Sequence, residues 1–210
     1  MVQKSADPAA TPASRPRGRP RSFDTEATLA NATLAFWQRG YAATSMDDLS
    51  AATGLNRPSL YGAFGDKHAL YLQALQLYTD QSNAAIAAAL EGRTLQDGLA
   101  RVYELALQLY CPADAAARGC LLIGTAATEA PRDEAIRQAL GDSLRGFTAA
   151  FEQRLRRALD EGELPDGTDV AMRAQLASAV LHSMALRARA GDAPKDLAAF
   201  AAASVTMVCA

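Results

Sequence analysis

The sequence contains few cysteines and no long apolar run. Cys111, Cys120 and Cys209 are too few and too unevenly spaced for a disulfide framework, so we expect a reducing, cytoplasmic environment. No stretch approaches the roughly 18 consecutive apolar residues that a membrane helix needs. The N-terminus also lacks the apolar segment of a signal peptide. The sequence therefore predicts a cytoplasmic protein without a membrane span.

Strand patterns are also missing. Polar and apolar residues do not alternate over any useful length, as they would in a half-buried strand. Glycine (14) and proline (9) are few, whereas alanine, the residue with the best helix propensity, occurs 48 times. We therefore expect an all-α protein.

Charge of either sign is not in large excess, but its distribution is uneven. The formal net charge is −2. Residues 1–23 carry five basic groups and one acidic group, a net of +4, and the other 187 residues carry 16 basic and 22 acidic groups, a net of −6. A basic end on an acidic body predicts that one end meets a polyanion such as nucleic acid. Residues 1–22, polar and rich in proline, are expected to form a disordered basic arm.

Capping side chains and glycines divide the rest of the chain into helices. In the first half, short helices are expected after Asp24, after Thr44 or Ser45, and after Asn56, followed by a long helix from Asp66 to about Leu90. In the second half, Pro131 and Pro194 are expected in first turns, where proline is tolerated. The helices expected there cover residues 94–110, 116–129, 132–161, 169–190 and 194–209. We assign residues 23–68 to a small N-terminal domain and 69–210 to a larger helical one.

The segment from Thr44 to Lys67 carries the clearest motif. Two short helices flank the turn Gly54-Leu55-Asn56, and Leu49, Leu55 and Leu60 are spaced to meet between them. This spacing is typical of a helix-turn-helix, whose second helix enters a DNA major groove. The turn alone is equally compatible with an ordinary small helical bundle.

Several further segments in the same register resemble the TetR family of bacterial transcriptional regulators. They are F-W-Q-R-G-Y at 36–41, the Thr44-Ser45 helix start, Gly54, and L-Y-G-A-F-G-D-K at 60–67. The resemblance covers about residues 23–75, and Ser50 departs from it where alanine is usual. Farther on, R-G-C-L-L at 118–122 and A-L-R-A-R-A-G-D at 185–192 look like pieces of one branch of the family. The resemblance implies a three-helix DNA-binding domain followed by a helical ligand-binding and dimerisation domain.

Candidate DNA contacts follow from the chemistry of the side chains. Arginine reads guanine with paired donors, serine and tyrosine donate to phosphates or bases, and a glycine lets the backbone approach the duplex. Helix N-termini attract phosphates. The candidates are Arg57, Ser59, Tyr61 and Gly62 on the second helix, and Thr44, Ser45 and Lys67 at helix starts. The alternatives are a packed ring for Tyr61 and an ordinary solvated amine for Lys67.

The basic arm contains R-G-R-P at 17–20, which resembles the core of an AT-hook. Glycine and proline keep such a segment extended, and arginines fit a narrow A·T-rich minor groove. We therefore add Arg17, Arg19 and Arg21 to the candidate DNA contacts. The alternative is a solubilising tail.

The larger domain contains a few rings, thiols and polar tips on apolar faces. The resemblance implies that this region encloses a pocket for a small-molecule effector, and such groups suit an apolar ligand with one or two hydrogen-bonding groups. Cys120 follows Gly119 at an expected helix start, which would lower the pKa of its thiol and suit a redox or electrophile sensor. Plain core packing is the alternative for each residue. The candidates are Tyr103, Tyr110, Cys120, Phe147, Phe151 and His182.

Small residues fill the last two expected helices, along 180–186 and 197–208. Such apolar faces let helices approach closely and are too apolar for the surface of a monomer. The resemblance implies a four-helix interface in a homodimer and therefore a palindromic double-stranded operator. Packing within one chain is the alternative.

Other functions have less support in the sequence. A helical enzyme needs a polar catalytic cluster, and only two histidines, His68 and His182, are present. No cysteine–histidine spacing fits zinc, and no glycine-rich loop fits a phosphate cofactor, so we expect no cofactor. The expected function is a repressor that a small molecule releases from its operator. The alternatives are a cysteine-based sensor of the same fold and an architectural protein that binds A·T-rich DNA.

Overall fold

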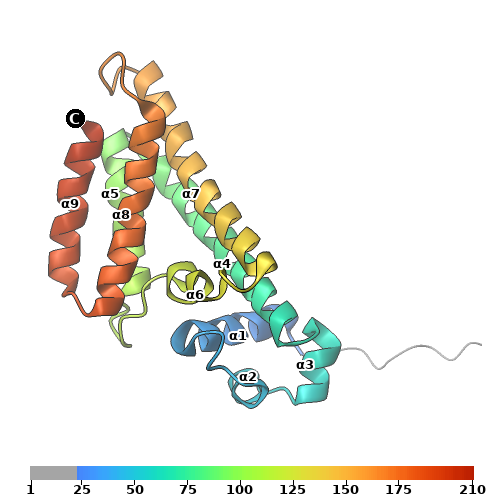
Figure 1. Ribbon diagram of the computed structural model, residues 1–210. Helices are drawn as coiled ribbons and strands as arrows, with labels where there is room; N and C mark the ends of the chain where they lie inside the picture. Colours follow the sequence, from blue (N-terminus) through green and yellow to red (C-terminus); the bar gives the residue numbers. More distant parts are fainter. Residues whose placement is uncertain (1–22) are drawn as a thin grey trace, which may run out of the picture.

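The computed structural model describes residues 23–210, and every regular element in that range is helical, which confirms the all-α prediction (Figure 1). The N-terminal domain consists of α1 (Thr25–Arg39), α2 (Met46–Thr53) and α3 (Arg57–Phe64). The long helix α4 (Lys67–Leu90) leaves this domain and runs along the rest of the molecule.

The short helices begin and end at the residues that the capping signals predict. The Asp24 carboxylate accepts hydrogen bonds from the first-turn N–H groups of Glu26 and Ala27, at 2.9 and 3.1 Å. The α4 helix begins in the same way, with Asp66 accepting from the N–H of Ala69 at 2.8 Å. Gly40 ends α1 with a positive φ of 83°, a conformation that costs glycine little.

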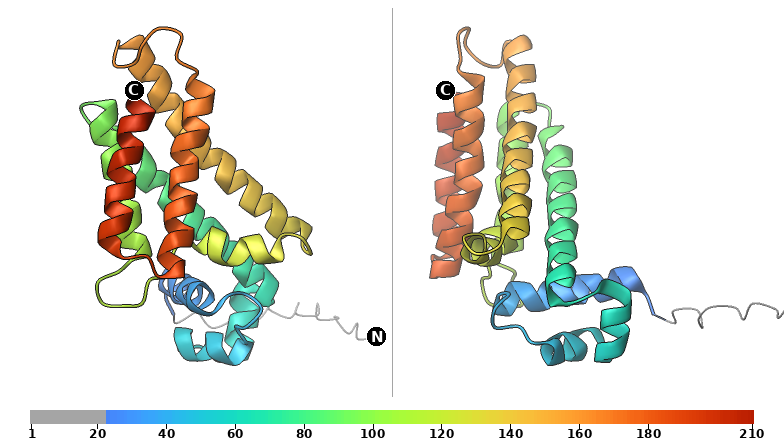
Figure 2. Two further views of the ribbon diagram at one scale, coloured as in Figure 1. Left: turned by 60° about the vertical axis from the view of Figure 1, so that its left-hand side comes forward. Right: turned by 45° about the vertical axis from the view of Figure 1, so that its right-hand side comes forward.

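The larger domain contains α5 (Leu95–Tyr110), α7 (Glu134–Asp160), α8 (Val170–Ala190) and α9 (Pro194–Cys209). The α7 helix lies alongside α4, and α8 packs against α5, α7 and α9. Figure 2 shows α8 and α9 as a pair at the edge of the molecule that lies away from α4. This edge leaves one side of the pair without a covering helix from the described part of the chain.

The expected helix over 116–129 is wrong in its first half. Residues 112–120 form no helix, and the backbone N–H groups of Arg118 and Gly119 donate to the carbonyl of Tyr110 instead. The chain then forms a π-helical segment, η1 (Leu122–Ala126), and the short α6 (Ala127–Glu129). Pro131 is not in a first turn either, because Asp133 caps α7 two residues later; Pro194 does occupy the first turn of α9.

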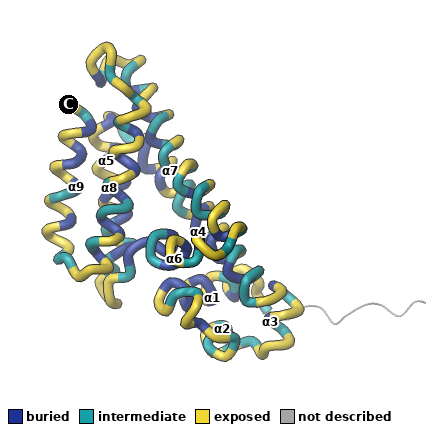
Figure 3. Tube along the Cα trace, viewed as in Figure 1, coloured by how far each residue is buried: buried dark blue, intermediate teal, exposed yellow. Residues whose placement is uncertain are grey.

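One hydrophobic core runs through both domains. It extends from Phe36 in α1 through α4 to Val208 in α9 (Figure 3). Buried residues along α4, such as Tyr71 and Tyr78, belong to this core and face both halves. The fourth helix therefore joins the two packing units.

Candidate DNA-recognition surface and effector cavity

Local hydrogen bonds fix the helix-turn-helix. Ser45 and Asp48 form a reciprocal capping box at the start of α2, in which each side chain accepts from the other residue's backbone N–H. Gly54 then takes a left-handed conformation, with φ 70° and ψ 7°. The Asn56 side chain accepts from the N–H of Ser59 at 2.9 Å and starts α3. Leu49 and Leu60, both fully buried, belong to the core beneath these two helices.

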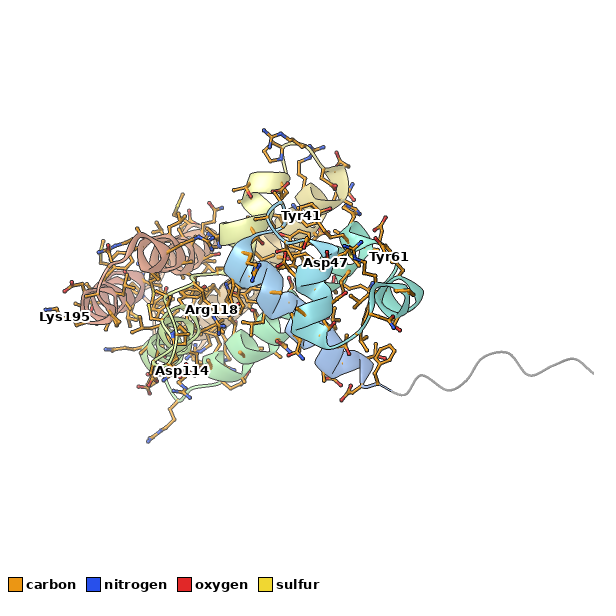
Figure 4. All side chains as sticks on the ribbon, turned by 90° about the horizontal axis from the view of Figure 1, so that it is seen from below. Tyr41, Asp47, Tyr61, Asp114, Arg118 and Lys195 are labelled. Atoms are coloured by element: carbon orange, nitrogen blue, oxygen red, sulfur yellow. The ribbon has the colours of Figure 1, made fainter. Side chains whose placement is uncertain are left out.

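The predicted residues on α3 lie at or near the surface. Tyr61 is 49% exposed, so the alternative of a fully packed ring is wrong. Ser59 is half-buried, and Gly62 is exposed with no described atom within 4 Å of the position that a Cβ would take. Seen from below, Tyr61 lies on α3 and Asp47 on the neighbouring α2 (Figure 4). The side chain of Tyr61 and the backbone at Gly62 are therefore accessible to a partner at this face.

Arg57, the candidate base-reading residue, is held by an acidic partner. Its Nε and Nη2 atoms donate to the two carboxylate oxygens of Asp47, at 2.8 and 2.5 Å. The hydrogen bond to Arg57 lowers the pKa of Asp47 and raises that of Arg57. The sequence analysis did not predict this pairing. A DNA contact through Nε and Nη2 together would therefore have to replace the Asp47 carboxylate.

Two candidates at helix starts are engaged inside the protein. Thr44, predicted as a phosphate contact at a helix start, is fully buried, and its hydroxyl donates to the Gly40 carbonyl at 2.6 Å. Lys67 donates from Nζ to the carbonyls of Tyr41 and Thr44, at 2.9 and 2.8 Å, and lies 4.4 Å from the Tyr41 ring centroid. It is therefore not an ordinary solvated lysine, since its amine holds the loop before α2. Ser45 is exposed at the start of α2.

The arm arginines Arg17, Arg19 and Arg21 lie outside the described residues. Their expected minor-groove role is therefore a matter for experiment. The described part of the chain begins at Phe23, just before the cap of α1.

A cavity of about 310 Å³ lies in the larger domain, and α1 contributes one residue to its wall. Four of the six predicted ligand residues line it: Tyr110, Cys120, Phe147 and His182. Sequence reasoning missed the other polar or aromatic lining residues, which come from α1 and α4. These are Trp37, Tyr78, Gln81 and Ser82.

Tyr103 and Phe151, the other two predicted ligand residues, do not line this cavity. Both are buried, at 1% and 0% exposure, and their ring centroids lie 6.5 Å apart. The hydroxyl of Tyr103 donates to the Ala177 carbonyl in α8 at 3.1 Å. These rings therefore fill the core between α5, α7 and α8, away from the cavity.

The environment of Cys120 contradicts the predicted low-pKa thiol. Burial raises the pKa of Cys120, although hydrogen bonds from Tyr78, Tyr110 and the N–H groups of Leu122 and Ile123 partly oppose this. The Tyr78 hydroxyl donates to Sγ at 3.2 Å. The residue is 4% exposed, so its thiol faces the cavity and not bulk solvent.

The cavity wall is neutral: no acidic or basic side chain among the described residues lines it, apart from the imidazole of His182. Burial lowers the pKa of His182, which keeps this imidazole neutral near pH 7. Its Nε2 atom is buried and has no hydrogen-bond partner within residues 23–210. The cavity thus offers apolar surface and neutral hydrogen-bonding groups to an occupant.

Metal-binding and membrane-spanning features are both missing from the described range. Residues 23–210 hold no cluster of three or more histidine, cysteine, aspartate or glutamate side chains suited to a metal ion. In the same range, no helix combines the length and apolar character needed to cross a membrane.

Comparison with known proteins gives matches along most of the chain. Residues 29–74 match the family described as bacterial regulatory proteins, tetR family, and residues 98–204 match the tetracyclin repressor-like C-terminal domain. The HTH-type transcriptional repressor ComR of Escherichia coli (strain K12) is 31% identical over 177 residues, which cover 83% of this chain and 84% of ComR. The uncharacterized HTH-type transcriptional regulator YezE of Bacillus subtilis (strain 168) is 30% identical over 150 residues, or 70% of this chain and 77% of YezE.

Solved structures agree with these sequence matches. A cysteine mutant of the TetR family transcriptional regulator CifR, complexed with 26-bp double-strand operator DNA, superposes with a TM-score of 0.82 at 30% identity. The match covers 90% of this chain and 98% of CifR. A TetR-family regulator from Cytophaga hutchinsonii, 22% identical, shares the fold with a TM-score of 0.76 over 88% of this chain and 92% of its own. The motif resemblance is thus confirmed, and the chain belongs to the TetR family of bacterial transcriptional regulators.

Proposed function

We propose that this regulator is a homodimeric repressor whose hold on a palindromic operator weakens when a small molecule fills the cavity. The observation that carries the proposal is the composition of the cavity wall, which combines α1 of the DNA-binding domain with α4, α5, α7 and α8. An occupant therefore touches both domains at once. A ligand that favours one arrangement of the two domains shifts the protein toward it by its differential affinity for the two states.

The chemistry of the wall indicates the class of ligand. A charged ligand would lose its hydration there without meeting an opposite charge, which is costly. The neutral polar groups of Gln81, Ser82 and His182 can instead serve one or two hydrogen-bonding groups on an otherwise apolar molecule. A volume of about 310 Å³ is at the small end of ligand pockets, so the ligand is small.

An apolar face on α8 and α9 supports the proposed dimer. Met172, Leu176 and Leu186 of α8 are 52%, 53% and 55% exposed, and Met207 of α9 is 78% exposed. The helices α8 and α9 form a pair at the molecular edge (Figure 2). Pairing two copies through this face buries the same patch on each subunit, as a two-fold interface requires.

The dimer sets the geometry of DNA binding. Two copies of α3 must reach major grooves on one face of the duplex, about 34–36 Å apart or a multiple of that distance. Arg57 and Tyr61 then contact base edges or phosphates, Ser45 presents a helix start to the backbone, and the arm arginines enter the minor groove. CifR was solved with operator DNA, and ComR is a repressor by name. This role requires no catalysis and places the protein in the cytoplasm, with the DNA.

Selection of bound duplexes from a random pool tests this proposal. The expected product is a palindrome with the half-site spacing given above. An A·T-rich product without symmetry would contradict the dimeric regulator and favour the architectural alternative. The selected operator then serves in mobility-shift titrations with uncharged aromatic compounds, which are expected to release it.

A covalent input is a second candidate, because Cys120 lies in the cavity wall. Its thiol is shielded and its pKa raised, so only an electrophile that enters the cavity would reach it. The solved CifR structure carries substitutions at cysteines. If this input operates, a small uncharged electrophile releases the operator and Cys120→Ser abolishes the response. Equal release from Cys120→Ser would leave reversible binding as the input.

A further inference from the structure

Trp37 belongs to the DNA-binding domain but forms part of the cavity wall. It lies on α1, is 6% exposed, and is the one tryptophan in the sequence. Its ring meets the Tyr78 ring edge-on, with centroids 4.9 Å apart and an interplanar angle of 83°. Both rings line the cavity, so an occupant contacts an indole that belongs to α1.

The indole is also tied to the segment that follows α5. Its Nε1–H donates to the Gly119 carbonyl at 3.0 Å, in a buried hydrogen bond. The guanidinium of Arg118 lies 4.2 Å from the centroid of the ring. Cys120, which follows Gly119, lines the cavity and accepts the hydrogen bond from Tyr78. Trp37 and residues 118–120 thus form one connected unit beside the cavity.

The far side of this unit is blocked by α8. Gly119 has a φ of +63°, and a Cβ at that position would collide with the Ala185 carbonyl oxygen. The Arg189 guanidinium in α8 donates to the Arg118 carbonyl at 3.3 Å. The 118–120 backbone therefore has little room to move toward α8. An occupant that pushes on this unit is therefore expected to displace α1, which contacts the unit through Trp37.

We propose that Trp37 couples cavity occupancy to the recognition helix, an inference that rests on the proposed function. An uncharged occupant moves the indole away from the Gly119 carbonyl, and the shift tilts α1. The α1 helix packs on α2, and its Phe36 shares the core with Leu49 and Leu60 beneath α2 and α3. The recognition helix follows α1, so its spacing from the partner copy changes.

The test uses N-phenyl-1-naphthylamine, an uncharged aromatic fluorophore with a single N–H donor, and the operator obtained from the random pool. Operator Kd is measured with and without saturating probe for three proteins: wild type, Trp37→Phe, and Tyr103→Phe. Tyr103 is buried outside the cavity wall, and like Trp37 it donates one buried hydrogen bond to a backbone carbonyl, that of Ala177. Each protein is judged by its own ratio of the two Kd values, so a change in basal affinity cancels.

The expected ratio is at least about tenfold for wild type and Tyr103→Phe, within the usual range of allosteric coupling, and below about twofold for Trp37→Phe. Probe fluorescence and a thermal melt establish that Trp37→Phe is folded and binds the probe. If that variant releases the operator as wild type does, the coupling role of Trp37 is overturned and the ligand-responsive function stands. If wild type binds the probe and keeps its operator affinity, the proposed function fails and this inference fails with it.

A second measurement needs no variant. Excitation at the red edge of tryptophan absorption reports Trp37 alone in the wild-type protein. Because coupling is reciprocal, operator binding must alter the surroundings of the indole. A shift in emission on operator addition, absent with an unrelated duplex, supports the role of Trp37. Identical emission with and without bound operator overturns it.

Discussion

The recognition surface and the cavity wall differ most in charge. On the surface, Arg57 pairs with Asp47 and Arg39 pairs with Asp48, and all four side chains are at least partly exposed. The cavity wall has neutral groups throughout. The first arrangement suits a polyanion that exchanges with solvated partners, and the second suits a small uncharged molecule. The two regions thus differ in the chemistry that they offer to a partner, and in the proposed coupling they are joined by the indole of Trp37.

The largest expected effect is that of Gly119→Ala, which tests the contact between residues 118–120 and α8. Alanine with a positive φ costs about 1–2 kcal/mol, and forcing a methyl group into a packed contact adds about 1–3 kcal/mol. The expected loss in the free energy of unfolding is therefore about 2–5 kcal/mol. Urea denaturation at fixed protein concentration measures it.

The control is Gly167→Ala. Gly167 also has a positive φ, +80°, but no atom of the described residues lies within 4 Å of the added methyl position. Only the backbone cost of about 1–2 kcal/mol is expected there. Equal losses for the two variants would show that contact between the 118–120 segment and α8 contributes nothing.

Arg57→Ala tests whether Arg57 reads a base of the operator. Removing a paired base contact is expected to cost about 1–3 kcal/mol of operator affinity and to relax preference at one base position. Mobility-shift titration on the operator and its single-base variants measures both effects. Arg39→Ala, which removes the ion pair between Arg39 and Asp48, is the matched control. Unchanged affinity and preference in Arg57→Ala would remove Arg57 from the base-reading set.

Deletion of residues 1–21 tests the basic arm. We expect operator affinity to fall by about tenfold, on the order of 1.4 kcal/mol. The slope of log K against log salt should also fall by about 0.9 for each phosphate that the truncated protein no longer neutralises. Binding measured at several salt concentrations gives the slope. A truncated protein with the full-length slope would show that the arm does not bind DNA.

The smallest effect is expected for Asp47→Asn. An exposed ion pair contributes about 0.2–1 kcal/mol, and removing it frees Arg57 and takes a negative charge from the DNA-facing side. Operator affinity should therefore rise slightly, by less than about fivefold, with a similar rise on unrelated DNA. Weaker binding would instead mean that Asp47 orients Arg57 for its contact.

Local signals allowed the DNA-binding domain to be predicted closely. The caps at Ser45 and Asn56 and the positive φ of Gly54 depend on neighbours only a few residues away, so the sequence contains all the information they need. The pairing of Arg57 with Asp47 spans ten residues and two helices, and was missed. Residue type thus indicated the recognition helix but not how its arginine is held.

The cavity depends on distant parts of the chain and was predicted less well. Periodicity marks Tyr103 and Tyr110 alike as buried on α5, but only Tyr110 faces the cavity, because Tyr103 turns toward α8. Trp37 lies 82 residues from the Gly119 carbonyl that it binds. The expected helix start near 116 also failed for a long-range reason, since the close approach of Gly119 to α8 shapes that segment. The spacing of apolar residues predicts which side chains are buried, but it does not predict which residue a buried group contacts.

In the proposed mechanism, the cavity and the recognition surface share one equilibrium. The most direct measurement is the affinity of the wild-type cavity for N-phenyl-1-naphthylamine with and without saturating operator. Linkage requires operator binding to weaken probe binding by the same factor, at least about tenfold, as the probe weakens operator binding. Equal probe affinity in the free and operator-bound protein would contradict the claim.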